Sequence, residues 1–523
     1  MLPRARQTQP TQFNIATLLT RSRFFTRSDN FWYNNRMKIY KAVGAAILSA
    51  VAFGAADART LEVSAWRGET VAARIDDFVE LGDAPEGIGV KFGVMRKVDY
   101  APRPHVLERK QVYDRVVWGE RDGGVRVVEI SVPENAKPGI YKCGMMNIRV
   151  VDRVLPPPKA WKYYLDLWQH PWAVARIAGV KPFSSRHYKA MTPVWKLLAT
   201  AGQKALTVSI LDEPWDHQCY DAYKSLIGRV KKNDGTWEYD YSTFDEYVEF
   251  GRKCGIGPDI ACYTMCPWEY GVSYKNENGE MVKITAKPNT KEFDEFWGPF
   301  LADFASHLKA KGWFKDTLIA MDERSPDDVL YIAKFIQKFA PGMRIAMAGN
   351  RKPSDFKGIT IDSYSQILSL ATDDFLAECA ERRAKGYITT HYVCCWPLYP
   401  NTFMKSGDGE AFWLGAYPGV SEFDGFLRWA WNSWPYDPKK DATYWNWHSG
   451  DTFLCYPDGQ PSWRFLELRN GIVAAEKLRI LKERGLLTEE IKNVARLYKY
   501  KEATDGKSDY RHIRAKTLEV VNK

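Results

Sequence analysis

The segment TLIAMDERSPDDV, residues 317–329, contains the pattern from which we predict the fold. An apolar run of strand length ends at two adjacent acids, Asp322 and Glu323, and a helix signal follows directly. Ser325 can cap a helix N-terminus, a proline suits the first helical position, and an acid occupies the third. The segment therefore predicts a β-strand that turns sharply into an α-helix over residues 325–339.

The same order of strand and helix recurs along residues 156–485. The other strand segments are WKYYLDLWQHP (161–171), ALTVSILDEPW (205–215), DIACYTMCP (259–267), RIAMAGN (344–350), TIDSYSQI (360–367), YITTHYVCCWP (387–397) and GFLRWAWNSW (425–434). Eight such units are typical of a (β/α)8 barrel of the TIM type. A doubly wound open sheet is the alternative, but no glycine-rich phosphate-binding fingerprint follows the first strand.

A different pattern precedes the barrel. Residues 59–155 contain short alternating segments separated by turn signals, which predicts a β-sandwich. Three consecutive prolines, 156–158, stiffen the chain and mark the boundary. Residues 486–523 follow the barrel as a tail that we expect to be helical or partly disordered. We therefore predict a multidomain chain, an N-terminal β-sandwich followed by a TIM-like barrel.

Residues 37–58, MKIYKAVGAAILSAVAFGAADA, have the features of a signal peptide. A basic start is followed by an apolar run and by Ala-Asp-Ala as a cleavage site. The run is shorter than the roughly 20 apolar residues of a membrane span, so a membrane anchor is the weaker alternative. We expect an exported protein, periplasmic or extracellular, with no stable membrane span. We interpret residues 1–36 as upstream sequence from an over-early start codon.

Composition narrows the classes of partner. The formal net charge is +10, but residues 1–58 carry eight Lys/Arg and two Asp, so the remainder is too mildly basic to indicate nucleic acid. The 20 Trp and 28 Tyr indicate either a Trp-rich core or an aromatic binding cleft, where sugars stack on flat rings. The nine cysteines follow no disulfide or zinc spacing, so we expect most to be buried, with one disulfide left open.

Two connections after barrel strands are long enough to hold β-hairpins. The turn signals KKNDG (231–235) and NENG (276–279) each lie between alternating residues. Both hairpins would rise from the face where barrel active sites form and would wall it, which suits an enzyme that acts on a chain end.

Carboxylates, amides and tryptophans gather at the predicted strand ends. The sequence contains no Ser–His–Asp order that favours a serine hydrolase, no H-E-x-x-H zinc motif and no phosphate-binding loop. We expect no metal and no cofactor. Glycosidases use this set of side chains to donate a proton and to stabilise an oxocarbenium-like centre.

Asp322 and Glu323 are the strongest catalytic candidates. Strand alternation places Asp322 on the same side as Ala320, and Glu323 at the tip where the backbone turns. Because adjacent carboxylates repel, one can keep its proton near neutral pH and act as a general acid. Neighbouring residues cannot flank a sugar from two sides, so either another carboxylate is the partner or a 2-acetamido oxygen of the substrate attacks C1. The structural alternative is strand-end capping with an ion pair to Arg324.

A second pair, Asp212 and Glu213, has the same spacing. A proline and a loop follow it in place of a capped helix, so its geometry is less constrained. We interpret this pair as a sugar-hydroxyl binder or a structural pair.

Three segments with the preceding β-domain resemble glycoside hydrolase family 123. They are LIAMDE (318–323), YVCCWPLYPNTF (392–403) and DGFLRWAWNSW (424–434). The resemblance implies a bacterial, retaining exo-β-N-acetylgalactosaminidase that uses substrate-assisted catalysis on glycolipid or glycoprotein glycans with terminal β-linked GalNAc. It also implies that Asp322 stabilises an oxazolinium ion and that Glu323 is the acid/base.

Six further residues are assigned as substrate contacts. Four lie in the matching motifs: Trp396, Asn401, Trp429 and Asn432. Two are assigned from strand position: Tyr364 and Asp212.

Two other functions stay open. One is a barrel glycosidase of another specificity, with Glu323 as the acid and Asp212 or Glu213 as the nucleophile. The other is a glycan-binding protein without turnover.

Overall fold

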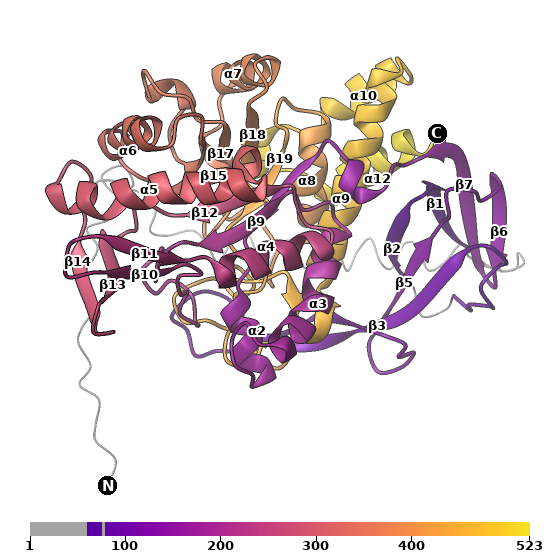
Figure 1. Ribbon diagram of the computed structural model, residues 1–523. Coiled ribbons are helices and arrows are strands. Elements are labelled where there is room, and N and C mark those ends of the chain that lie inside the picture. Colours follow the sequence, from indigo (N-terminus) through magenta and orange to yellow (C-terminus); the bar gives the residue numbers. More distant parts are fainter. Residues whose placement is uncertain (1–59, 76–78) are drawn as a thin grey trace, which may run out of the picture. The chain divides into compact units, whose positions relative to one another are not determined.

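The structure is a computed structural model that describes residues 60–75 and 79–523 (Figure 1). The predicted signal peptide, residues 37–58, and the upstream residues 1–36 lie outside the described residues. Among the described helices, none is both long and apolar enough to cross a membrane.

Residues 61–154 form the predicted sandwich of two sheets. One sheet has the order β1 (Leu61–Arg67), β7 (Met146–Val154), β6 (Gly139–Cys143). The other has the order β2 (Thr70–Arg74), β5 (Val125–Ser131), β3 (Gly89–Tyr100), β4 (Lys110–Trp118). Val128 and Ile130 of β5 pack against Val63 and Ile148 of the facing sheet, so apolar residues from both sheets fill one core.

The predicted barrel follows, with eight parallel strands. Their order is β8 (Tyr164–Leu167), β19 (Gly425–Arg428), β18 (Ile388–Tyr392), β17 (Ser363–Ile367), β16 (Arg344–Gly349), β15 (Thr317–Asp322), β12 (Asp259–Tyr263) and β9 (Ala205–Ser209). All eight strands were predicted from the sequence, and the predicted fold class is confirmed.

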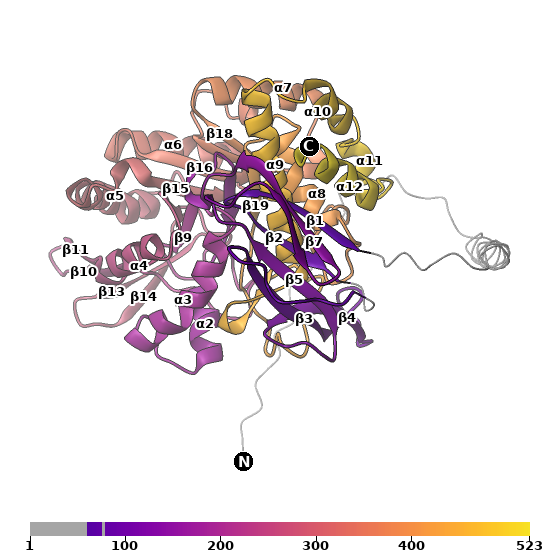
Figure 2. The same ribbon diagram turned by 90° about the vertical axis from the view of Figure 1, so that its right-hand side faces the viewer.

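Helices surround the strands, as Figures 1 and 2 show. They are α2 (Pro171–Ala178), α3 (Ser185–Ala199), α4 (Ser242–Lys253), α5 (Lys291–Lys311), α6 (Pro326–Phe339), α7 (Asp373–Ala384), α8 (Glu410–Ala416) and α9 (Trp463–Glu483). The sequence did not predict α2. A short 3-10 turn, Pro353–Asp355, follows β16 in place of a helix. The predicted cap of α6 is confirmed, because Ser325 Oγ accepts a hydrogen bond from the backbone N of Asp328 (3.2 Å).

Two glutamine side chains bridge the barrel between its first and second strands, β8 and β9. The backbone N of Lys204 donates to Leu165 O across this seam (2.9 Å). The Gln203 amide accepts from Leu167 N (3.0 Å) and donates to Ala205 O (2.7 Å). Gln169 accepts from Thr207 N (2.8 Å) higher along the same seam. The side-chain amides thus satisfy backbone groups that a regular ladder would otherwise pair.

The two predicted hairpins are confirmed, and they join into one sheet. They are β10 (Gly228–Lys231) with β11 (Trp237–Asp240), and β13 (Gly271–Asn276) with β14 (Met281–Thr285). β10 and β13 pair in parallel, with Val230 opposite Lys275. The four-stranded sheet rises from the carboxyl ends of β9 and β12, which is the face where the site residues lie.

Residues 486–523 contain three helices, of which the first and the last pack against α9. They are α10 (Thr488–Ala495), α11 (Tyr500–Thr504) and α12 (Tyr510–Val521). The indole N–H of Trp66 in β1 donates to Val521 O (2.8 Å). Lys477 of α9 is fully buried and contacts Glu69 (2.6 Å) and Asn522 (2.9 Å). The C-terminal segment therefore ties the sandwich to the last barrel helix.

We predict that Gln203→Ala lowers the free energy of unfolding by about 1–3 kcal/mol, because the buried backbone N–H of Leu167 loses its acceptor. Urea denaturation measures the change. The control is Gln111→Ala, which removes an exposed glutamine bonded to Asp99 and should cost less than about 0.5 kcal/mol. Equal effects of the two substitutions would contradict the role of the seam.

Candidate active site

Small residues pack together with aromatic residues inside the barrel. Four alanines of β9, β12, β15 and β16 share one buried cluster with Trp168, Tyr263 and Tyr392; they are Ala205, Ala261, Ala320 and Ala348. The small side chains leave room for the rings. Asp322 lies two residues after Ala320 on β15 and therefore faces the same interior, as predicted.

Glu323 occupies the turn between β15 and α6. Its φ of 23° lies in the left-handed region, which is costly for a residue with a side chain. The backbone N of Glu323 donates to Ala348 O (2.8 Å), and the capped start of α6 follows two residues later. The hydroxyl of Tyr392, at the end of β18, donates to Glu323 Oε1. The strand, the helix cap and Tyr392 together fix the position of this carboxylate.

Burial disfavours the charged form of Asp322. Loss of water around the carboxyl, and then the neighbouring charge of Glu323, raise its pKa to about 8. The indole of Trp268 and the charge of Arg324 oppose this shift without cancelling it. Burial therefore favours the protonated form of Asp322 at neutral pH, whereas the expected general acid, Glu323, is the other member of the pair.

Arg324 does not form the ion pair of the structural alternative. Its guanidinium lies 5.0 Å from the ring centroids of both Trp268 and Tyr270. It also donates to Trp268 O (3.3 Å). In the part of the chain that the structure describes, no ion pair joins Arg324 to Asp322 or Glu323. Neither carboxylate is therefore neutralised by a direct ion pair with Arg324.

Aromatic rings flank the pair. The rings of Trp168 and Trp215 stack with centroids 5.0 Å apart, and Tyr263 lies 4.5 Å from Trp168. The indole N–H of Trp215 is buried and has no hydrogen-bond partner among the described residues. Both indoles are almost fully buried, so they pack the barrel interior beside the pair.

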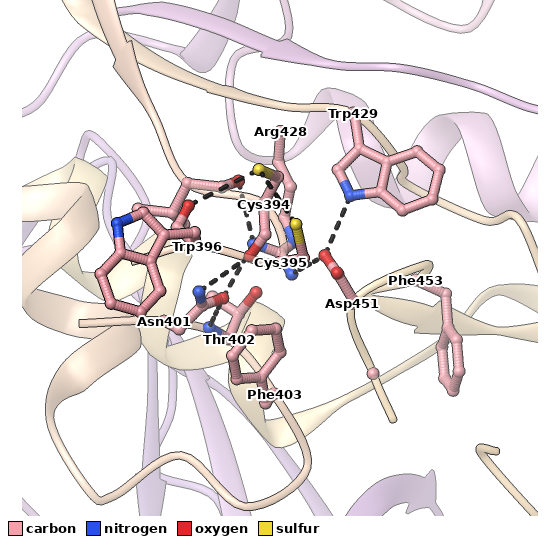
Figure 3. A network of polar contacts seen from close by, with 12 residues as sticks. Cys394, Cys395, Trp396, Asn401, Thr402, Phe403, Arg428, Trp429, Asp451 and Phe453 are labelled. Atoms are coloured by element: carbon pink, nitrogen blue, oxygen red, sulfur yellow. Dashed lines mark hydrogen bonds and ion pairs between the residues drawn. The ribbon is translucent and has the colours of Figure 1, made fainter. Parts of the chain in front are cut away.

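A buried ion pair supports the other side of the site (Figure 3). Arg428 and Asp451 are fully buried and lie 2.8 Å apart. Asp451 Oδ1 also accepts from the Trp429 indole (2.9 Å), and Arg428 donates to Val393 O (3.2 Å) and Asn401 Oδ1 (3.0 Å). This network fixes Trp429 and the loop after β18 relative to the strand ends.

Two predicted substrate contacts, Asn401 and Asn432, are buried and bonded within the protein. The Asn401 amide donates to Cys394 O (2.9 Å) and Pro397 O (2.7 Å), and its oxygen accepts from Thr402 N and Arg428. All four bonding positions of the amide are thus used, so it holds the loop and has none left for a sugar. Asn432 exchanges two 2.9 Å bonds with the backbone of His170, which joins the ends of β19 and β8.

Tyr364 and Asp212 do not lie beside the pair in the way that strand position indicated. Tyr364 is the second residue of β17, where we had placed it near the strand end; it packs on the helix side, and its hydroxyl donates to Arg351 O. Asp212 accepts from Ser225 N (2.8 Å) and lines a cavity of about 400 Å³ under the hairpin sheet. Strand alternation explains the correction for Tyr364: Ile367 belongs to the interior cluster, so Tyr364, three residues earlier, points to the helix side.

The two predicted aromatic contacts remain accessible. Trp396 is 54% exposed on the loop after β18. Trp429 is half-buried, and its ring lies edge-on to Trp447 with centroids 5.5 Å apart. Both can present a face to a ligand, so their assignment as sugar contacts stays a prediction.

The two histidines near the strand ends have structural roles. His170 and His391 are fully buried, and burial lowers the pKa of each to about 3. His170 caps α2, and His391 contacts Leu414 O. Within residues 60–75 and 79–523, no group of three or more His, Cys, Asp or Glu side chains could hold a metal ion.

Comparison with known proteins identifies the family. A family model described as glycoside hydrolase 123, catalytic domain, matches residues 168–481. The chain belongs to glycoside hydrolase family 123. The protein is therefore a glycoside hydrolase, and the expected resemblance is confirmed.

One solved structure supports the fold of this glycoside hydrolase. A family 123 glycoside hydrolase from Clostridium perfringens, analysed for the details of glycolipid glycan hydrolysis, matches with a TM-score of 0.76 at 24% identity, over 89% of this chain and 93% of that chain. The Clostridium thermocellum xylanase 10B matches with a TM-score of 0.33 at 9% identity, over 78% of this chain and 84% of that chain, which is too distant to argue from. Among curated proteins, none matches the sequence.

Sequence reasoning missed several residues of the site. Tyr392 ends its strand inside the quoted motif YVCCWP, so its strand-end position was an available signal. Trp268 lies in a loop after β12, and Asp451 lies 23 residues beyond Arg428, with no local pattern to indicate either contact.

We predict that Asp322→Asn changes the pH dependence of thermal stability. The folded-state pKa of about 8 lies above the unfolded value of about 4, so the stabilisation associated with the bound proton is present at low pH and is lost as pH rises from about 4 to about 8. The melting temperature of Asp322→Asn should therefore rise relative to the wild type across that window.

The control is the same comparison in a Glu323→Gln background. In that background, the pH-dependent difference in melting temperature between the protein with Asp322 and its Asp322→Asn variant should become smaller, because the neighbouring negative charge is gone. A gap that is constant with pH, or that falls as pH rises, would contradict the raised pKa of Asp322.

Proposed function

We propose that the protein is an exported, retaining exo-β-N-acetylgalactosaminidase that removes terminal β-linked GalNAc by substrate-assisted catalysis. The observation that carries this proposal is the adjacency of Asp322 and Glu323 at one strand end, both turned to the barrel face with the aromatic cluster. In glycosidases with two opposed carboxylates, the groups lie about 5–9.5 Å apart on either side of the sugar. Neighbours on one strand can instead serve an acetamido group and a leaving oxygen on the same side.

The first step forms an oxazolinium ion. The acetamido oxygen of the substrate attacks C1, the glycosidic bond breaks, and the leaving oxygen takes a proton from Glu323. The Asp322 carboxylate accepts a hydrogen bond from the acetamido N–H and stabilises the positive charge that develops on the oxazolinium ring. In the second step Glu323 takes a proton from water, the water oxygen bonds to C1, and the bond between C1 and the acetamido oxygen breaks, which re-forms the acetamido group. Two inversions at C1 leave the β-configuration unchanged.

Substrate binding would move the shared proton between the two carboxylates. Burial raises the pKa of Asp322 and so favours the proton on that residue, while Glu323 accepts a hydrogen bond from the Tyr392 hydroxyl. A bound acetamido N–H supplies Asp322 with a donor that favours its carboxylate. The proton then belongs on Glu323, where the reaction needs it. The acetamido group therefore supplies the nucleophile and also places the proton on the general acid, Glu323.

Three observations support action on a chain end outside the cell. The hairpin sheet β11–β10–β13–β14 rises beside the carboxyl ends of β9 and β12, where it can limit the site to a terminal sugar. The family 123 protein from Clostridium perfringens was studied for glycolipid glycan hydrolysis, which favours a glycolipid or glycoprotein glycan here. Residues 37–58 have the sequence of a signal peptide, which favours a periplasmic or extracellular location.

We predict that Glu323→Gln lowers kcat/KM for aryl β-GalNAc substrates with poor leaving groups by about 10²–10⁴-fold, because the leaving oxygen loses its proton donor. The loss should shrink toward unity for dinitrophenyl β-GalNAc, whose leaving group needs no proton. Steady-state kinetics across a series of aryl leaving groups measures both effects.

The matched control is Glu213→Gln, in the twin pair, which also has a positive φ of 49°. It should give no such dependence on the leaving group. If it did, the alternative in which Glu213 takes part in the chemistry would replace this one. Faster hydrolysis of aryl β-GlcNAc than of aryl β-GalNAc would contradict the proposed sugar.

A further inference from the structure

Two neighbouring thiols lie at the edge of the site. Cys394 and Cys395 follow β18, and their Sγ atoms are 3.9 Å apart (Figure 3). All nine cysteines are free. Cys395 is exposed and Cys394 is half-buried, whereas the other cysteines except Cys219 are buried. This pair is therefore the accessible dithiol of the described chain.

The two thiols differ in reactivity. Hydrogen bonding from Cys394 lowers the pKa of Cys395, and the same interaction raises the pKa of Cys394. The thiolate, the reactive form, thus develops on the exposed sulfur. The half-buried thiol next to it is placed to attack any sulfur that becomes bonded to Cys395.

The dithiol is physically joined to the catalytic groups. Tyr392, which donates to Glu323, lies two residues before Cys394. The backbone N of Cys394 donates to Trp396 O (3.1 Å), and its carbonyl accepts from the Asn401 amide (2.9 Å). Cys394 also packs against the aromatic cluster that contains Trp168 and Tyr392. A change of backbone at Cys394 therefore acts on the groups around Glu323.

We propose that Cys394 and Cys395 are a thiol modification site at the rim of the active site, which small disulfides oxidise to a vicinal disulfide. The Cys395 thiolate attacks one sulfur of the small disulfide, and the other sulfur leaves as a thiol after taking a proton. The Cys394 thiolate then attacks Cys395 Sγ, and the second small thiol leaves. The protein loses two electrons and two protons, and the small disulfide is reduced to two thiols.

Closure of this ring must distort the loop. The two Sγ atoms have to move from 3.9 Å to about 2 Å apart, while consecutive Cα atoms stay near 3.8 Å, below the range of about 4.4–6.8 Å that relaxed disulfides prefer. Strained disulfides are readily reduced, so the modification is reversible. Because Tyr392 and Trp396 flank the pair, we infer that the oxidised form hydrolyses substrate more slowly.

The test uses the reduced full-length protein with oxidised glutathione as the probe. Intact mass followed by peptide mapping should show loss of two hydrogens within the peptide that contains residues 394–395. Under the proposed function, kcat/KM for aryl β-GalNAc should fall by about 10-fold to 100-fold, because a small displacement of catalytic groups has effects of that size. Dithiothreitol should restore both the mass and the activity.

Three variants separate the outcomes. Cys395→Ser should abolish both the reaction and the sensitivity to oxidised glutathione. Cys394→Ser should lack the loss of two hydrogens and instead keep a glutathione adduct on Cys395, whereas Cys219→Ser, which removes the other half-buried thiol, should behave like the unmutated protein. A stable glutathione adduct on Cys395 of the unmutated protein, or no change in mass, would overturn the site. Closure without a change in kcat/KM would overturn its coupling to the active site. The mass readout is independent of the substrate, so failure of the proposed activity is distinguishable from failure of the dithiol.

Discussion

Two adjacent carboxylates in a desolvated barrel mouth cannot both be charged at low cost. Burial and the charge of Glu323 together raise the pKa of Asp322, and Arg324, held by Trp268 and Tyr270, neutralises neither acid by direct contact. The site therefore keeps one proton that two groups can share. Where that proton resides depends on which hydrogen-bond donors face each carboxylate, and a substrate amide is such a donor. The proposed mechanism follows from this constraint.

The surrounding structure serves to hold the pair and its neighbours in place. Glu323 has a costly backbone conformation that persists because β15 and the capped α6 fix both of its sides. At the end of β19, Arg428 pairs with Asp451 of the following loop entirely out of water. The pair stabilises little by itself but would leave an unpaired buried charge if either partner were removed. Its function is to fix Trp429 and the loop that carries Cys394 and Trp396.

Local sequence patterns predicted the elements of the fold that residues close together in the sequence determine. The eight strands, the hairpins and the cap of α6 each have an alternation, a turn signal or a cap in the sequence. The Gln203 seam, the pairing of β10 with β13 and the contact between Arg428 and Asp451 join residues without any shared local pattern, so the sequence could not indicate them. Asn401 and Asn432 were expected to contact sugar because they lie in the motifs that resemble the family, but both are buried and bonded within the protein. Tyr364 was misplaced because strand alternation, with Ile367 facing the barrel interior, turns it to the helix side.

The central claim is that the acetamido oxygen of the substrate is the nucleophile and that Asp322 and Glu323 serve it from one side. The most direct measurement is kcat/KM for aryl β-GalNAc substrates in which the N-acetyl group carries none, one, two or three fluorine atoms. Fluorine withdraws electrons from the carbonyl oxygen, so the account predicts a steep and continuous fall in kcat/KM along the series. A rate that does not change with fluorine content would contradict it, because a protein carboxylate would then be the nucleophile.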